Sequence, residues 1–377
     1  MTREHILAWL REEDPARLEQ LFAEADQTRR ANVGDAVHFR GLIEFSNVCR
    51  RQCGYCGLRA GNLGISRYRM TEAEILDSAA QAVAFGCGTV VLQSGEDPAT
   101  DTDWLARIVR HIKATTPLAV TLSVGERPQA DLLAWRQAGA DRYLLRFETS
   151  DPQLFARIHP PLQGAMPATV PALPGSQACG GKKPNSEDMA AKKAAMPPAK
   201  PCDRLAQLRL MRTLGYQVGS GVMLGIPGQR YDSLANDIVL FAELELDMIG
   251  VGPYLPHPQT PLGVLPADAG DQVPNTEMMT YKVIALARLV CPRANIPSTT
   301  ALATVNLAQG RELGLLRGAN VVMPNMTPPK YRAMYEIYPA KACIRETPAD
   351  CNGCLRGRVA SIGRFVGTGR GDTQREK

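Results

Sequence analysis

The sequence predicts an α/β fold, and more narrowly a complete (βα)₈ TIM barrel, from the order of its apolar segments. Eight short runs rich in β-branched and apolar residues recur along the 377 residues, and stretches with helix signals separate them. Strand and helix in alternation, repeated eight times, favour a closed parallel barrel. A doubly wound sheet would instead place a phosphate-binding glycine fingerprint after its first strand, and the sequence has none at that point.

The expected elements follow one another in a regular order. A helical extension over about residues 3–30 comes first. The expected strands are 41–46, 88–95, 117–126, 142–148, 218–227, 248–256, 296–302 and 319–325. The expected helices between them are 71–86, 99–115, 128–138, 203–215, 230–246, 274–290 and 303–315. The first of these helices opens with Thr71 and Glu74, which have the spacing of a capping box.

The chain is expected to divide into four parts. These are an N-terminal helical extension (1–34), the barrel (35–340), a cysteine-containing C-terminal segment (341–366) and a disordered tail (367–377). Residues 165–202, inside the barrel, hold seven Pro and nine Ala and few large apolar side chains. Such a segment cannot bury enough surface to offset its chain entropy, so we expect a disordered insertion there. A lid over the barrel mouth is the alternative, because βα loops open onto that face.

Charge and composition narrow the class of partner. The net charge of +5 lies in residues 165–202 (+3) and 364–377 (+2), which leaves the rest of the chain neutral. This distribution argues against nucleic acid or a membrane surface and indicates a small ligand. No apolar run approaches the ~18 residues of a membrane span, and the N-terminus lacks a signal-peptide core, so we expect a cytoplasmic protein. Ten cysteines in that reducing compartment indicate metal or redox chemistry.

Three cysteines directly after the first expected strand give the strongest chemical signal. Cys49, Cys53 and Cys56 have a spacing at which three thiolates can hold one face of an iron–sulfur cube and leave the fourth iron open. An open coordination position is typical of a reactive site. The alternative, a zinc knuckle, needs a fourth ligand nearby, and no His or Cys follows until Cys87, beyond an expected helix.

This triad, with Tyr55 before its last cysteine, resembles the signature of the radical S-adenosylmethionine (SAM) superfamily. The resemblance implies a [4Fe–4S] cluster whose open iron binds SAM and whose electron cleaves SAM to a 5′-deoxyadenosyl radical. It also implies cofactor-binding roles at the strand ends, for Tyr55, Ser94, Gly95, Glu96, Arg146, Glu148, Arg204 and Met223. The resemblance implies that Arg204 pairs with the SAM carboxylate. The insertion lies directly before Arg204, so this role would be lost if the insertion displaced the arginine.

Longer segments, among them 43–59, 214–229 and 318–331, resemble the HydE family of radical SAM maturases, which help to assemble the active-site cluster (H-cluster) of [FeFe]-hydrogenase. The resemblance covers about residues 35–366. It implies an organometallic substrate, a cysteine-bound iron with carbon monoxide and cyanide ligands, Fe(CO)₂(CN), and transient contact with the maturases HydG and HydF. The expected substrate residues are hydrogen-bond donors at the barrel mouth, namely Thr121, Ser123, Arg142, Thr299 and Thr300. The two last threonines have barrel filler as an alternative role.

A second cysteine triad lies near the C-terminus. Cys343, Cys351 and Cys354 reproduce the spacing of an accessory site in many HydE proteins, which implies a second iron–sulfur cluster, [2Fe–2S] or [4Fe–4S]. Three incidental cysteines, or a zinc site with an outside ligand, are the alternatives. Tyr335 and Tyr338 are expected either to close the lower part of the substrate site or only to pack.

Two other functions stay open from the sequence. One is a radical SAM mutase that acts on an amino acid, of the methylornithine synthase type. The other is an iron–sulfur electron-transfer protein without SAM chemistry. The C-terminal triad favours the HydE type, because the methylornithine synthase family is expected to lack it. Cys87 and Cys291 match no ligand pattern and are expected to be small buried side chains.

Overall fold

The computed structural model describes residues 1–161, 203–265 and 270–373. The expected insertion (165–202) and the last four residues of the expected tail (374–377) therefore lie outside the described residues. Among the described residues, no helix combines the length and apolar character that a membrane crossing requires.

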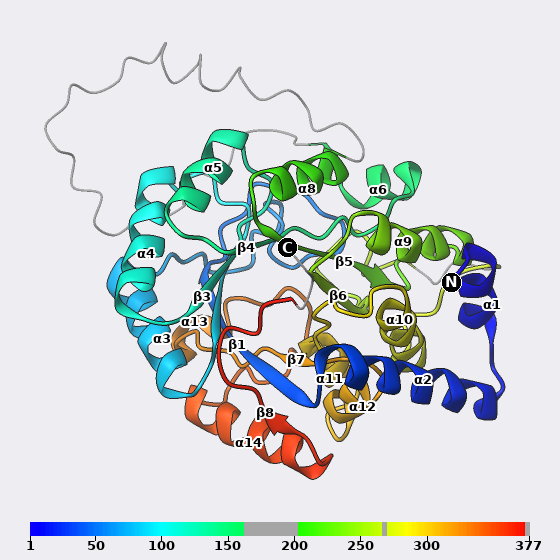
Figure 1. The fold of residues 1–377 in the computed structure, drawn as a ribbon. Helices are drawn as coiled ribbons and strands as arrows, with labels where there is room; N and C mark the ends of the chain where they lie inside the picture. The colour runs from blue at the N-terminus through cyan, green and yellow to red at the C-terminus, as the bar shows by residue number, and fades with distance from the viewer. Residues whose placement is uncertain (162–202, 266–269, 374–377) are drawn as a thin grey trace, which may run out of the picture.

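One curled sheet of parallel strands forms the centre of the molecule (Figure 1). Its strands run in the order β6-β5-β4-β3-β2-β1-β7, and β8 pairs with β1. The strands are β1 (Ala36–Ser46), β2 (Thr89–Ser94), β3 (Ala119–Ser123), β4 (Arg142–Leu144), β5 (Gln217–Leu224), β6 (Met248–Pro253), β7 (Val321–Val322) and β8 (Phe365–Val366). All pairs are parallel, so the carboxyl ends of the strands meet at one edge, where barrel-like folds place their chemistry.

Helices cover the outer face of this sheet (Figure 1). They are α1 (Arg3–Arg11), α2 (Pro15–Val33), α3 (Glu72–Ala84), α4 (Thr102–Thr115), α5 (Gln129–Gln137), α6 (Pro152–Ile158), α8 (Asp203–Thr213), α9 (Tyr231–Glu243), α10 (Glu277–Val290), α11 (Thr300–Val305), α12 (Gly310–Leu316), α13 (Pro329–Arg332) and α14 (Pro348–Ser361). The expected capping box is present, because Thr71 accepts from the Glu74 N–H and the Glu74 carboxylate accepts from the Thr71 N–H. The expected N-terminal extension consists of α1 and α2, which pack on α9 and α10.

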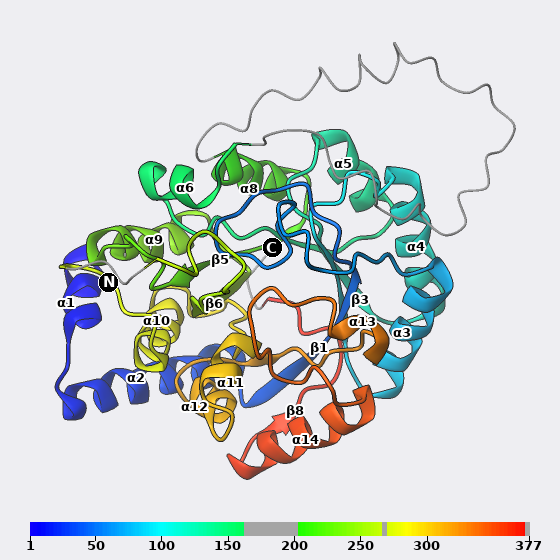
Figure 2. The same ribbon diagram turned by 180° about the vertical axis from the view of Figure 1, so that it is seen from behind.

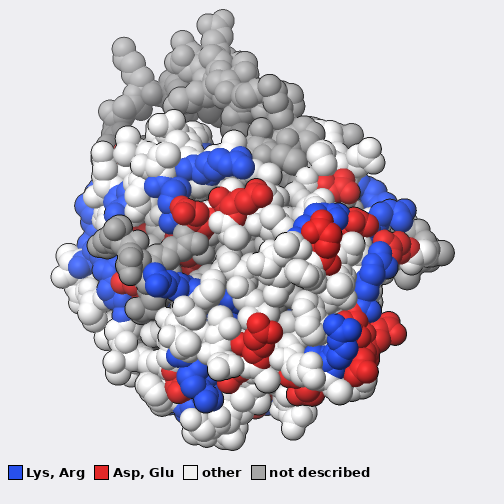
Figure 3. Space-filling view, turned by 45° about the vertical axis from the view of Figure 1, so that its right-hand side comes forward, with Lys and Arg blue, Asp and Glu red and all other residues white. Residues whose placement is uncertain are grey.

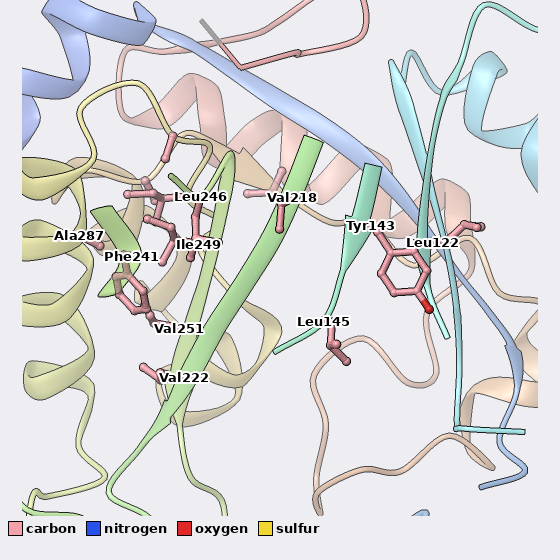
Figure 4. Packing of buried hydrophobic residues seen from close by; sticks show 14 of the residues in the cluster. Leu122, Tyr143, Leu145, Val218, Val222, Phe241, Leu246, Ile249, Val251 and Ala287 are labelled. Carbon is pink, nitrogen blue, oxygen red and sulfur yellow. The ribbon is translucent and has the colours of Figure 1, made fainter. Parts of the chain in front are cut away.

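Apolar side chains fill the layer between the strands and the outer helices (Figure 4). Val218 and Ile249 come from β5 and β6, and Phe241 and Ala287 from α9 and α10. All four are buried, and each large aliphatic or aromatic side chain buried in this way contributes about 1.5–3 kcal/mol. On the face shown in Figure 3, Lys and Arg side chains are interspersed with Asp and Glu.

The expected seventh strand, 296–302, is wrong as a regular strand. Residues around it form only isolated bridges, Asn295 with Met248 of β6 and Pro297 with Val321 of β7. Pro297 lacks the N–H that a ladder needs, and the Thr299 hydroxyl caps α11 by accepting from the Leu302 N–H. The described strands therefore form a curled parallel half-barrel, β1 to β7, and the expectation of a complete (βα)₈ barrel is not met.

The end of the described chain crosses the sheet at the amino ends of its strands, so the expectation of a disordered tail is wrong for residues 367–373. We call these residues the strap (Figure 1, red). The Gly367 N–H donates to the Val37 carbonyl, and the Thr89 hydroxyl donates to the Arg370 carbonyl at 2.8 Å. Gly88 lies so close below that a Cβ there would be 1.5 Å from the Gly369 oxygen. The strap thus continues the packing of the sheet.

The strap supplies partners to two buried arginines, and this explains its order. Arg142 of β4 donates to the Asp372 carboxylate at 2.6 Å, and Gln217 donates to the same oxygen at 2.8 Å. Arg40 of β1 donates to the Gly371 carbonyl at 3.2 Å. A buried guanidinium without such acceptors is costly, because charge is stabilised poorly away from water.

Replacement of Asp372 by Asn should therefore destabilise the protein by about 1–3 kcal/mol, the usual contribution of a hydrogen bond to a charged group. Burial opposes ionisation of this carboxylate, but the Arg142 guanidinium holds the pKa of Asp372 below its ordinary value. The stabilisation is thus present at neutral pH and is lost as the pH falls through that lowered pKa. Urea unfolding followed by circular dichroism measures it at pH 7.

The matched control is Asp232→Asn. Asp232 pairs with Arg3 at the same distance, 2.6 Å, but the Arg3 side chain is 35% exposed, whereas Arg142 is 4% exposed. An exposed pair contributes about 0–1 kcal/mol, so this variant should unfold close to wild type. Equal effects of the two substitutions would contradict the structural role assigned to the strap.

Candidate active site

The loop after β1 brings the first cysteine triad to the carboxyl edge of the sheet (Figure 2, blue loop over the centre). Asn47 ties the loop together by donating to the Ser66 and Met334 carbonyls at 2.7 Å. Arg67 donates to the Asn47 and Leu58 carbonyls at 2.7 and 2.8 Å. These bonds satisfy an irregular backbone, and they hold the cysteines in one place without regular secondary structure.

The three thiols of this triad lie close enough to influence one another. Burial, followed by the charges of its neighbours, raises the pKa of Cys49 to about 12 and raises the pKa of Cys56 further. Burial also raises the pKa of Cys53, although Arg204 and Arg51 oppose the shift. Thiols of this kind ionise when a metal centre supplies positive charge, so the donor set fits a metal–sulfur group better than free nucleophiles.

Within residues 1–161, 203–265 and 270–373, no group of three or more His, Cys, Asp and Glu side chains could hold a single metal ion. The zinc knuckle alternative therefore has no support from the described residues. A triad of thiols beside a cavity matches the donor set of a cluster held at three irons.

The cavity next to the triad has a volume of about 350 Å³, which is sufficient for a small ligand. It opens among the carboxyl ends of the strands. Six of the eight expected cofactor residues line it, as does Cys56 of the triad. The six are Tyr55, Ser94, Arg146, Glu148, Arg204 and Met223. The expected substrate residues Ser123, Thr299 and Thr300 line the same cavity, as do Tyr335 and Tyr338.

Gly95 and Glu96 contact the triad loop rather than the cavity. A Cβ on Gly95 would lie 2.3 Å from the Val48 oxygen, so this close approach requires glycine. The Glu96 N–H donates to the Cys49 sulfur at 3.4 Å, and the Glu96 carboxylate pairs with Arg50 at 2.8 Å. The Glu96 side chain is thus engaged by Arg50, and the role expected for Ser94, Gly95 and Glu96 is one for their backbone, which stays a prediction.

Arg142 and Thr121 are not at the mouth of the cavity, which corrects their expected placement. Arg142 is the first residue of β4 and lies at the opposite edge of the sheet, against the strap. Thr121 pairs with it in the β3–β4 ladder. Both line a second, much smaller cavity of about 10 Å³ together with Arg40 and Gln217. Their position before the carboxyl ends of their strands separates them from the triad.

Glu148 sits in a strained backbone conformation beside the first cavity. Regular β4 pairing stops at Leu144, and Glu148 follows with φ of 65°, an unusual value for a residue with a side chain. Its N–H donates to the Gly221 carbonyl at 3.1 Å, and its carboxylate pairs with Arg146 at 3.1 Å. Nε of Arg146 is buried and has no hydrogen-bond partner among the described residues. Strain of this kind is typical of residues that a site holds in a required orientation.

Arg204 reaches the cavity from the start of α8, so the preceding insertion does not displace it. Its Nε donates to the Glu126 carboxylate at 2.8 Å, and its Nη1 donates to the Arg146 carbonyl at 2.8 Å. Burial opposes ionisation of Glu126, but Arg204 and Arg51 lower the pKa of Glu126, which keeps this carboxylate charged. Nη2 of Arg204 has no protein acceptor among the described residues and can bind an anionic ligand.

The sequence analysis did not identify several residues of the site. Glu126 holds Arg204, and its position just after β3 was a usable signal. His159 lies 3.0 Å from the Tyr55 hydroxyl, and burial lowers the pKa of His159, so it is neutral. Glu44 and Lys341 pair on the cavity wall, and no local pattern connects two residues so far apart in the chain.

The C-terminal triad is only partly brought together. A hydrogen bond between Cys343 and Cys351, together with nearby Arg311, lowers the pKa of Cys343 to about 6 although burial opposes it. Cys351 and Cys354 lie three residues apart on α14, so they share one side of that helix. Cys354 is exposed, whereas Cys87 and Cys291 are buried as expected.

Comparisons with known proteins agree with this site. The sequence model of the radical SAM superfamily matches residues 43–167. The chain is 41% identical over 374 residues, 99% of its length and 94% of the relative, to the protein named [FeFe] hydrogenase maturase subunit HydE of Thermotoga maritima. A 3-methylornithine synthase of Methanosarcina acetivorans is 25% identical over 85% of this chain and 79% of that protein.

Solved structures share the fold. The structure of a methylornithine synthase aligns with this protein over 97% of this chain and 94% of that chain, with a TM-score of 0.74 and 24% identity. The maturase HydG of Carboxydothermus hydrogenoformans gives a TM-score of 0.73 at 15% identity, over 97% of this chain and 75% of its own. With the cysteine triad, the cavity and full-length identity of 41% to a HydE protein, the chain belongs to the HydE family of radical SAM maturases and is a radical SAM enzyme of that type.

Proposed function

We propose that this enzyme converts a small organometallic precursor, an Fe(CO)₂(CN)–cysteine complex, during assembly of the H-cluster of [FeFe]-hydrogenase. The observation that carries the proposal is a mainly apolar cavity that begins at Cys56 and has a few charged and hydroxyl side chains on its wall. Membership of the HydE family supports the hydrogenase pathway, because the Thermotoga relative is named for that maturation.

Cys49, Cys53 and Cys56 would hold the [4Fe–4S] cluster beside the cavity that Cys56 lines. When bound, the cluster and SAM supply a 5′-deoxyadenosyl radical to this cavity. Arg204 would hold the SAM carboxylate through its spare Nη2 donors, because Glu126 and the Arg146 carbonyl already fix its other nitrogens. Glu126 is thus a positioning residue for Arg204.

Other residues of the same wall would orient SAM. Glu148 would accept from the ribose hydroxyls, while Met223 and Tyr55 would flank the adenine. The contact of 3.0 Å with His159 fixes the Tyr55 ring, since it anchors the hydroxyl at the end of that side chain. Ser94 would bind the amino group of SAM through the backbone at the end of β2.

Ser123, Thr299 and Thr300 would donate hydrogen bonds to the anionic ligands of the substrate. Tyr335 and Tyr338 would close the cavity, because both side chains line it and Tyr335 is almost wholly buried. A closed and dry cavity protects a reactive radical from side reactions. We further propose that Cys343, Cys351 and Cys354 hold a second iron–sulfur cluster, and that the enzyme works in the cytoplasm in transient contact with HydG and HydF.

Anaerobically reconstituted protein with dithionite and SAM should release 5′-deoxyadenosine. Addition of the synthetic Fe(CO)₂(CN)–cysteine complex should consume the complex and give a new, SAM-dependent iron signal in electron paramagnetic resonance. Catalytic formation of a lysine isomer from lysine would instead show a mutase of the methylornithine synthase type. A loaded cluster whose spectrum does not respond to SAM would show an electron-transfer protein.

Replacement of Cys53 by Ala should abolish SAM cleavage, because two thiolates cannot hold the cluster at three irons. Chromatographic assay of 5′-deoxyadenosine, with iron content as a second measurement, checks this. Cys87→Ala is the matched control, since Cys87 is buried and does not line the cavity, and it should retain at least half of the wild-type rate. SAM cleavage by the Cys53 variant would refute the assignment of the triad.

Replacement of Arg204 by Met should raise the KM for SAM about tenfold to a hundredfold, which corresponds to loss of charge-assisted hydrogen bonds of about 1.5–3 kcal/mol. Arg209→Met is the control, because Arg209 is exposed on the same helix. Steady-state assays of SAM cleavage compare the two variants. An unchanged KM in the Arg204 variant would mean that another residue binds the SAM carboxylate.

A further inference from the structure

A buried ion pair on the cavity wall has no part in binding SAM as described above. Glu44 lies near the carboxyl end of β1, and Lys341 lies between α13 and α14. Their side chains are 1% and 5% exposed, and the Lys341 ammonium donates to Oε1 of Glu44. Both residues line the same cavity as Cys56 and Arg204. The pair is therefore within the site but outside the set of residues assigned to the cofactor.

Glu44 is held rigidly from three directions. Its N–H donates to the Thr327 hydroxyl at 2.8 Å, and its carbonyl accepts from the Tyr68 hydroxyl at 2.6 Å. Its Oε2 accepts from the Asn325 amide at 3.0 Å. A carboxylate oxygen offers two lone pairs, so each oxygen of Glu44 can accept one more hydrogen bond. The carboxylate is thus fixed in place and still able to bind a donor.

Lys341 retains a spare donor. An ammonium group has three N–H bonds. Among the described residues, its acceptors are the Glu44 carboxylate and, at 3.5 Å, the Tyr335 carbonyl. The Nζ also lies 5.2 Å from the centre of the Tyr335 ring. At least one N–H is therefore without a protein oxygen and is available to a ligand in the cavity.

The charge balance of the pair selects the kind of ligand. A buried ion pair is rarely more stabilising than an apolar pair of similar size, so a pair at a cavity wall indicates a role in recognition. A simple anion would be attracted by Lys341 but repelled by Glu44. A zwitterion offers a carboxylate to Lys341 and an ammonium to Glu44, and it leaves no charge unpaired. The α-amino acid head group has this arrangement.

We propose that Glu44 and Lys341 bind the α-ammonium and α-carboxylate groups of the substrate's amino acid. This inference rests on the proposed function, in which cysteine is the organic ligand of the iron complex. The head group would lie on this wall, and the sulfur with its iron would remain free in the cavity. Glu44 and Lys341 would then decide which thiol ligand the enzyme accepts.

The test compares three synthetic iron dicarbonyl cyanide complexes whose thiol ligand is cysteine, cysteamine or 3-mercaptopropionate. Cysteamine lacks the carboxylate, and 3-mercaptopropionate lacks the ammonium. With wild-type holoenzyme, the KM for either truncated complex should be at least tenfold higher than for the cysteine complex. Lys341→Met should remove the preference for cysteine over cysteamine, and Glu44→Gln should remove the preference over 3-mercaptopropionate.

Lys330→Met is the matched control. Lys330 pairs with Glu74 at 2.6 Å, but Lys330 is 63% exposed on the outer surface. This variant should keep both preferences. The proposal is overturned if Lys341→Met also keeps both preferences for the cysteine complex, or if it raises KM equally for all three complexes. In either case the ion pair only anchors the chain after α13. Where Lys341→Met fails to fold, the Glu44→Gln result decides alone.

Failure of the proposed function is read separately. If wild type turns over none of the three complexes, the proposed function is wrong, and calorimetry on SAM-loaded holoenzyme then tests the head-group site. The probes are S-methyl-L-cysteine, 2-(methylthio)ethylamine and 3-(methylthio)propionate, which have no free thiol to bind iron. Wild type should bind the first at least ten times more tightly than the others, and Lys341→Met should not. Equal binding of all three by wild type overturns the inference.

Discussion

The site depends on three half-buried thiols in the loop after β1. Burial raises the pKa of Cys49, Cys53 and Cys56, so their ionised form requires nearby positive charge. Arg51 and Arg204 supply part of it at Cys53, and a bound metal cluster would supply the rest. The loop after β1, the cavity beside it and the arginines around it are all arranged to meet this one electrostatic requirement.

The surrounding charges occur in pairs, and each pair holds one partner in place for a ligand. Glu126 orients Arg204, and Glu148 pairs with Arg146. Glu44 orients Lys341 in the same way on another wall. Charges of both signs in a poorly hydrated cavity interact strongly with each other and with whatever enters, which favours ligands that carry matching charges of both signs. SAM contains an amino acid, and so does the substrate that we propose.

Local sequence motifs predicted those residues of the site that lie directly after a strand or at the start of a helix. The cysteine triad, Ser94, Glu148 and Arg204 all follow strands or open helices, so their meeting at one edge follows from parallel topology. The prediction that Arg142 lies at the cavity mouth was wrong because Arg142 is the first residue of β4, whereas the mouth lies at the carboxyl ends of the strands. Thr121 pairs with Arg142 and was misplaced with it. The pairing of Glu44 with Lys341 joins residues almost 300 positions apart, and no single-sequence pattern contains that information.

Composition gave wrong predictions for two segments whose structure is determined by contacts with the rest of the protein. Pro297 and the capping threonine after it end the ladder in a segment whose β-branched residues indicate a strand. The strap is rich in glycine, as disordered tails are, but its carbonyl groups and Asp372 accept hydrogen bonds from Arg40 of β1 and Arg142 of β4. Disorder was predicted from the composition of this segment alone, whereas its order comes from contacts with Arg40 and Arg142, which lie elsewhere in the chain.

The strap also has a consequence for the order of folding. Arg40 is synthesised some 330 residues before the Gly371 carbonyl that it contacts. Until that late segment arrives, the guanidinium groups at the base of the sheet must stay hydrated, and this end of the core cannot dry. Contacts of such sequence separation form slowly, because a long loop must close first. The base of the sheet is therefore complete only when the strap has docked.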